Sequence, residues 1–152
     1  MSTKFFALFA LLFLVACQSD SQKTTDEVMT IHDEAMADMA KLNARALSIK
    51  AWYDVLPDSD EAALLGDTLL NTILMLRQAD DGMGTWMQEL ADNRDSIDQL
   101  SDATAFWQAE KERITAVRNG IDSAVLVADK LLLKAPVAVL KPASDTTTVE
   151  HE

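Results

Sequence analysis

The sequence predicts an all-α fold, an antiparallel up-down-up three-helix bundle with long helices. Apolar side chains recur at spacings of three and four along three segments after residue 25, which is the period of one face of an α-helix. The prolines lie outside these segments, with Pro57 between the first two and Pro136 just after the third. Helices of roughly 33 residues would each be about 50 Å long, and short turns between them favour antiparallel neighbours.

The first helix is expected at about residues 26–55. Thr24 with Glu27 fits a capping box, in which two side chains satisfy the free N–H groups of a first turn. Pro57 disfavours a helical conformation in the residue before it, so the helix should end there. The apolar stripe of this segment consists of Val28, Ile31, Ala35, Met39, Leu42, Ala46, Ile49 and Tyr53.

The second helix is expected at about 59–91, after another capping box made by Asp58 and Glu61. Gly82 and Gly84 lie inside it, and each costs about 1 kcal/mol relative to alanine in a helix. We therefore expect a bend or a close helix contact at these glycines. The stripe is Leu65, Leu69, Thr72, Leu76, Ala79, Met83, Trp86 and Leu90.

The third helix is expected at about 98–134. Lys130 and Lys134 lie in its last turn, where the helix dipole favours cations. The bundle would then comprise residues 26–135, followed by a flexible polar tail at 136–152. The buried side of the third helix is marked by Ala103, Phe106, Glu110, Val117, Ile121, Ala124, Ala128 and Leu131.

The first seventeen residues have the pattern of a bacterial lipoprotein leader. Lys4 precedes an apolar run of about eleven residues, which is too short to span a bilayer as a helix. The run ends in Leu-Val-Ala-Cys, which resembles the lipobox. The resemblance implies removal of residues 1–16, a diacylglyceryl thioether on Cys17 and acylation of the new amine. Residues 17–25 are polar and would form a lipidated tether; the alternative is a plain secreted protein.

Lipidation of Cys17 would hold the protein on a membrane without spanning it. Several acyl chains exceed the single-chain case, in which binding is marginal and reversible. Gln18 follows the cysteine, whereas Asp at that position resembles an inner-membrane retention signal; the outer membrane, facing the periplasm or the cell surface, is therefore favoured. Cys17 is the sole cysteine, so no disulfide is expected.

Charge and length narrow the range of functions. Cleavage would leave 136 residues (152 − 16), enough for one domain with a core, and a net charge of −13 (−12 − 1, because only Lys4 is removed). This acidity argues against binding nucleic acid or anionic headgroups through charge. No serine or cysteine nucleophile has a plausible base, and no glycine-rich phosphate loop is present, so an enzyme is not expected.

Three blocks of the chain combine histidine, methionine and tryptophan with charged residues: "VMTIHDEAMADM", "RQADDGMGTWMQEL" and "FWQAEKERI". Together they resemble a family of small uncharacterised bacterial lipoproteins. Members of that family similarly carry a lipobox followed by a helical domain with HDE..M and GM..WM blocks. The resemblance implies an envelope address and an all-α fold, and it transfers no activity.

His32 is the only histidine before the C-terminal tail, and it shares a helix face with neighbouring methionines. If the first turn centres near Pro57, residue i faces about residue 114 − i, so His32 would lie opposite about position 82. The residues expected to gather at this end of the bundle are Met29, His32, Met36, Met83, Trp86, Met87 and Trp107.

Three interpretations of this cluster are open. Methionine fills irregular gaps and packs well on aromatic rings, so the leading interpretation is a hydrophobic core with no cofactor. The second is a soft-metal site for Cu(I), formed by His32 with Met29, Met36, Met83 or Met87, because thioether and imidazole are its preferred ligands. The third is haem or a small apolar ligand, lined by Trp86 and Trp107.

The leading functional hypothesis is therefore a non-enzymatic, lipid-anchored helical interaction or structural module of the envelope. Long amphipathic helices offer grooves to a partner helix or to a second copy of the chain. An envelope protein or self-association is the expected partner, together with the membrane through Cys17. The alternative is a copper- or haem-binding protein.

Overall fold

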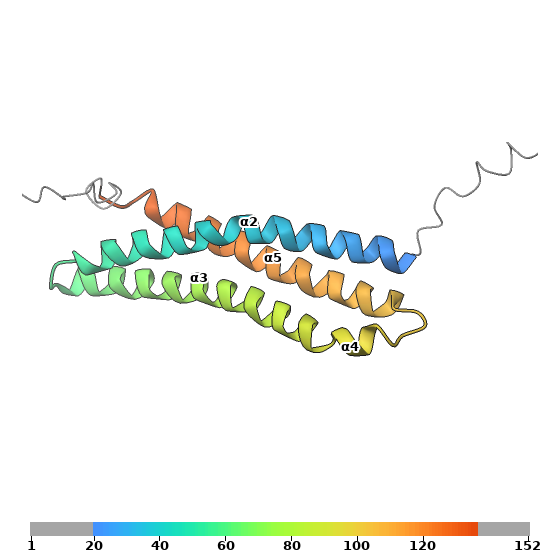
Figure 1. Cartoon of the computed structure of the whole chain (residues 1–152). Coiled ribbons are helices and arrows are strands. Elements are labelled where there is room, and N and C mark those ends of the chain that lie inside the picture. The colour runs from blue at the N-terminus through green and yellow to red at the C-terminus, as the bar shows by residue number, and fades with distance from the viewer. Residues whose placement is uncertain (1–19, 137–152) are drawn as a thin grey trace, which may run out of the picture.

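The computed structural model describes residues 20–136, and this part of the chain is all-helical, without a strand. The predicted leader, Cys17 and most of the predicted tail lie outside the described residues. The long helices lie side by side, with the short one at the end where the first helix begins (Figure 1). Among the described residues, no helix is both long and apolar enough to cross a membrane. The elements are α2 (Asp20–Asp54), α3 (Asp60–Asp92), α4 (Arg94–Ile97) and α5 (Thr104–Leu132).

The ion pairs between α2 and α5 give the relative direction of these two helices. The partners in three pairs are always 84 positions apart in sequence. A constant difference in residue number requires two helices that run in the same direction, as α2 and α5 do in Figure 1. The pairs are Glu27 with Lys111, Glu34 with Arg118 and Arg45 with Asp129.

The core is formed by fully buried apolar side chains that recur every seven residues on each long helix. A seven-residue repeat, slightly shorter than two ideal helical turns, is typical of helices that pack through a continuous seam with a left-handed twist. The expected apolar stripes contain all of these positions except Ile114 of α5, which the predicted stripe omitted. The positions, each at most 1% exposed, are Val28, Ala35, Leu42 and Ile49 on α2, Leu69, Leu76 and Met83 on α3, and Ile114, Ile121 and Ala128 on α5.

The first helix begins six residues earlier than expected, at Asp20 instead of 26. Thr24 is not its cap, because its hydroxyl donates a hydrogen bond to the carbonyl of Asp20 at 2.9 Å. A threonine that bonds one turn back is compatible with a helix interior, and the sequence pattern of a capping box does not distinguish the two cases. Residues 20–25, assigned to the tether, therefore belong to α2.

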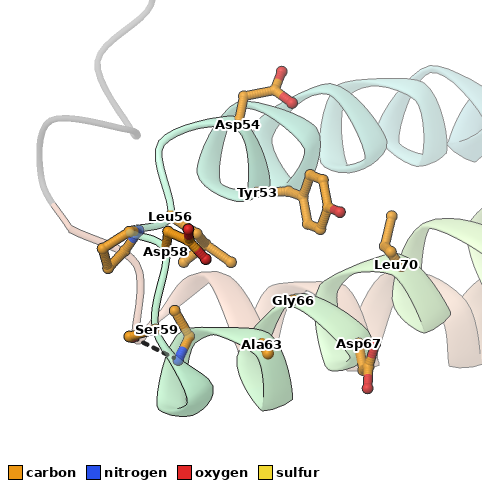
Figure 2. A pocket seen from close by; sticks show the side chains of 11 residues that line it. Tyr53, Asp54, Leu56, Asp58, Ser59, Ala63, Gly66, Asp67 and Leu70 are labelled. Carbon is orange, nitrogen blue, oxygen red and sulfur yellow. Dashed lines mark hydrogen bonds between the residues drawn. The ribbon is translucent and has the colours of Figure 1, made fainter.

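The other boundaries also differ in detail. Ser59, one residue after the expected Asp58, caps α3: its hydroxyl accepts a hydrogen bond from the N–H of Ala62 at 3.2 Å (Figure 2). The third helix, expected at 98–134, is α5 and spans only Thr104–Leu132, and the short helix α4 precedes the expected range. The start of α5 is held by Asp102, whose carboxylate accepts from the N–H of Thr104 at 2.8 Å. Hydrogen bonding with the side chain of Thr104, and then with its backbone N–H, lowers the pKa of Asp102 below its ordinary value.

Gly82 and Gly84 cause no break in α3 and no close helix contact. The helix continues through Gly82 and Gly84, and a Cβ placed on either would meet no atom within 4 Å. The expectation of a close contact was therefore wrong. Glycine costs a helix its conformational entropy even where nothing packs against it.

Substituting Gly84 with alanine is expected to raise the free energy of unfolding by about 0.5–1 kcal/mol, because the unfolded chain loses freedom and no contact is disturbed. Urea denaturation monitored by circular dichroism measures this. The matched control is Gly66→Ala, where the new Cβ would lie 3.4 Å from Cε2 of Tyr53, so the gain should be smaller. A loss of stability in Gly84→Ala would contradict the expectation.

Candidate functional site

An apolar groove lies at the end of the molecule where α2 begins and α3 passes into α4 (Figure 1). Its volume is about 460 Å³, and residues of all four helices line it. We call it the tryptophan groove. The lining residues are Met29, His32, Trp86, Met87, Leu90, Ala91, Arg94, Ile97, Asp98 and Trp107.

Trp86 forms the buried wall of the tryptophan groove. Its side chain is almost fully buried, and its ring centre lies 5.6 Å from that of His32, with the planes tilted by 33°. The contact lies one turn from the position expected opposite His32, near 82. The Nδ1 atom of His32 is 2.9 Å from a carboxylate oxygen of Asp33, so one ring nitrogen already has a polar partner.

Behind the wall, Trp86 holds a buried carboxylate. The indole Nε1–H donates to Oε2 of Glu110 at 2.9 Å, and Nη1 of Arg113 donates to Oε1 at 2.7 Å. Arg113 also pairs with Glu89 on α3. Burial raises the pKa of Glu110 above its ordinary value, and the hydrogen bond from Trp86 opposes this in part. The network joins α3 to α5 at the level of the groove.

The sequence placed Glu110 on the buried side of its helix but assigned it no role. The signal was a single carboxylate within an apolar stripe, which demands a polar partner. Its partner Trp86 is 24 positions away in sequence. The pairing follows from the packing of α3 against α5, and the spacing of residues alone did not reveal it.

The residues predicted as metal ligands are only partly brought together. Met29, His32 and Met87 line the tryptophan groove. Met36 instead lines a neighbouring hollow, which Met87 also borders, and Met83 is fully buried in the core. The two residues predicted to line a ligand site, Trp86 and Trp107, both line the groove.

Among the side chains that line the groove, two thioethers and one imidazole suit Cu(I), and the carboxylate of Asp98 is a hard ligand beside them. Harder metals need clusters of charged or imidazole ligands. Within residues 20–136, no group of three or more His, Cys, Asp or Glu side chains is arranged to hold a metal ion.

A second cleft lies at the opposite end, against the turn between α2 and α3 (Figure 2). Its volume is about 530 Å³. Tyr53 points from α2 toward α3 near Gly66, and acidic side chains, including Asp54 and Asp67, stand around it. Asp54 is bound by the amine of Lys50 at 2.5 Å. The cleft joins a packed aromatic ring to a solvated acidic surface, and none of the predicted site residues lines it.

The buried carboxylate predicts a pH dependence of stability. Because the pKa of Glu110 is higher in the folded than in the unfolded chain, the folded state binds more protons between the two values. Stability from this group is therefore greatest below the unfolded pKa and falls as pH rises through the folded one. The Glu110→Gln variant should lose this decrease in the free energy of unfolding with rising pH. Urea denaturation at a series of pH values from about 3 to 8 measures it.

The matched control for this measurement is Glu112→Gln, at an exposed position on the same helix. Its pH profile should follow that of the unmodified protein. Parallel profiles for Glu110→Gln and the unmodified protein would contradict the assignment.

The chain matches no protein-family model, no curated protein and no solved structure.

Proposed function

We propose that this protein is a bacterial envelope lipoprotein, anchored by lipid on Cys17, whose helical domain binds a partner and catalyses no reaction. The leader and its Leu-Val-Ala-Cys ending support the anchor. The resemblance of three sequence blocks to small bacterial lipoproteins supports the same address. The tryptophan groove carries the binding role, because it is a largely apolar surface left open by the packed helices.

The frame that carries the groove is, in this proposal, an antiparallel up-down-up three-helix bundle. The shared direction of α2 and α5 and the seven-residue spacing of buried side chains support it. A packed bundle of this kind keeps the groove formed before a partner arrives, so less ordering is required on binding.

The groove would lie close to the membrane. The described helix α2 begins three positions after Cys17 (20 − 17). Met29 and His32 are therefore about 14–18 Å along the helix axis from its first residue, at 1.5 Å per residue. A partner that reaches the groove would thus act at the surface of the bilayer, which favours a partner of the same membrane or a second anchored copy.

Site-specific photo-crosslinking in the living bacterium tests the binding role. A photoreactive residue at Met87 should give a defined adduct with an envelope protein or with a second copy of the chain. The control is Leu126 on α5, which is also exposed and does not line the groove. Equal labelling at both positions, or no adduct at Met87, would contradict the proposal.

Soft-metal binding is the second candidate, because Met29, His32 and Met87 line the same groove. Anaerobic titration with Cu(I) against a chelator tests it. A double variant, His32→Ala with Met87→Leu, should bind Cu(I) about tenfold more weakly or worse, because each lost ligand removes a direct metal bond. Met75→Leu, which changes a core-packing methionine outside the groove, is the control. Equal affinity in all three proteins would exclude the site.

A further inference from the structure

We infer that the tryptophan groove binds the acyl chain of a long-chain fatty acid, with the carboxylate of the ligand held by Arg94. The inference rests on the proposed function in treating this groove as the binding surface. It names the ligand as a small amphiphile of the membrane, whereas the proposed function names only a partner.

The apolar part of the groove fits a single hydrocarbon chain. Its volume of about 460 Å³ lies within the ~300–1,000 Å³ usual for small-molecule sites. Met29 and Met87 border it with exposed, unbranched side chains, which adapt to a flexible ligand. Trp86 and Trp107 add large, rigid apolar surfaces.

Arg94 supplies the groove with a cationic side chain that can bind an anionic head group. Arg94 lines the groove and is exposed, and among the described residues it forms no ion pair. Arg45, Arg113 and Arg118 each pair with a carboxylate of another helix. Arg77, like Arg94, forms no ion pair among the described residues, but it does not line the groove.

The planar guanidinium of Arg94 presents two parallel N–H donors that match a carboxylate. Asp98 also lines the groove and opposes an anion, so the head group must lie on the Arg94 side. The imidazole of His32 lines the same groove. It makes a hydrogen bond with Asp33, and its ring packs at a tilt against that of Trp86. The site therefore joins an apolar floor to one free cation, which is the complement of a fatty acid.

Tryptophan fluorescence gives a direct readout. The chain has three tryptophans, of which Trp86 and Trp107 line the groove, whereas Trp52 belongs to the core and does not. We would use the mature chain, residues 17–152, made without its leader so that Cys17 carries no lipid, and with Trp52→Phe. This form keeps every described residue. A palmitic acid brominated in mid-chain, titrated below its micelle concentration, should quench the emission saturably, and unlabelled palmitate should reverse it.

Chain length should control affinity. Each buried CH₂ group contributes about fourfold in the dissociation constant, so palmitate should bind far more tightly than laurate. A neutral sixteen-carbon alcohol should bind more weakly than palmitate by about tenfold or more, because Arg94 then has no carboxylate to bind. Equal affinity for the acid and the alcohol would overturn the role assigned to Arg94.

Two matched pairs of variants locate the ligand. Met87→Glu should weaken palmitate binding by about tenfold or more, because it places a charge in the apolar groove. Leu74→Glu should not weaken it, because Leu74 is exposed on the same helix but lies outside the groove. Arg94→Gln should weaken palmitate without affecting the alcohol, and Arg77→Gln, at an exposed position of α3, should affect neither. Unsaturable quenching, or equal effects within either pair, would overturn the inference.

Failure here is distinguishable from failure of the proposed function. Photo-crosslinking at Met87 in cells reports a protein partner and requires no fatty acid. A groove that forms the crosslink but takes no palmitate overturns the ligand alone. Palmitate binding without any crosslink would support the fatty-acid ligand and contradict the proposal of a protein partner.

Discussion

Replacing Trp86 with alanine is expected to lower the free energy of unfolding by about 3–5 kcal/mol, the range for deleting a fully buried large aromatic side chain. The indole is 2% exposed and contacts the ring of His32. It also donates the hydrogen bond to Glu110, so its removal leaves a buried carboxylate with less support. Urea denaturation followed by circular dichroism at pH 7 measures the change.

Trp86→Phe separates the two contributions to this loss. Phenylalanine keeps most of the apolar contact but removes the Nε1–H donor, so a smaller loss of about 1–3 kcal/mol is expected. Trp107, which is only half-buried, provides the control: Trp107→Ala should cost less than Trp86→Ala. A loss below about 1.5 kcal/mol in Trp86→Ala would mean that the groove wall is not part of the stable core.

Replacing Cys17 with serine is expected to abolish incorporation of labelled palmitate completely and to leave the leader uncut. In the proposed anchor the thiol carries the diacylglyceryl group, and a hydroxyl does not form the corresponding thioether. Metabolic labelling of the expressed protein, followed by electrophoresis, measures both effects. Label retained in Cys17→Ser would disprove the anchor.

The control for the anchor is Gln18→Asp, which leaves Cys17 in place. It should incorporate the same amount of label, and the protein should shift toward the inner membrane if the residue after the cysteine selects the membrane. Density-gradient separation of the two membranes measures this. An unchanged distribution would leave the lipid in place and remove the argument for the outer membrane.

The helical fold could be predicted because the apolar stripes are long and regular. Val28, Leu42 and Ile49 were all expected on a packed face, and all are buried. The ends were harder to predict, because they depend on single hydrogen bonds. Thr24 fitted a cap by sequence, yet its hydroxyl bonds one turn back within the helix.

The end of the bundle where the candidate site lies could be predicted from the sequence, but the set of residues that line it could not. The antiparallel estimate put His32 opposite about position 82, and its ring contact is with Trp86, one turn further. Met83, however, faces the core, whereas Met87, one turn later, is exposed. An uncertainty of one turn cannot decide which of two neighbouring methionines meets a groove. Glu110 was missed because its partner lies on another helix.

The early start of α2 has a consequence for encounter rates. The chain from Cys17 to Asp20 can span at most about 11 Å, at ~3.3–3.6 Å per residue. In the proposed lipoprotein such a short connection confines the groove to a thin layer above the bilayer. A ligand or partner embedded in the same leaflet then meets the groove at a high effective concentration, in the millimolar range typical of short linkers. Even an interaction that is weak in solution would be largely occupied at the membrane.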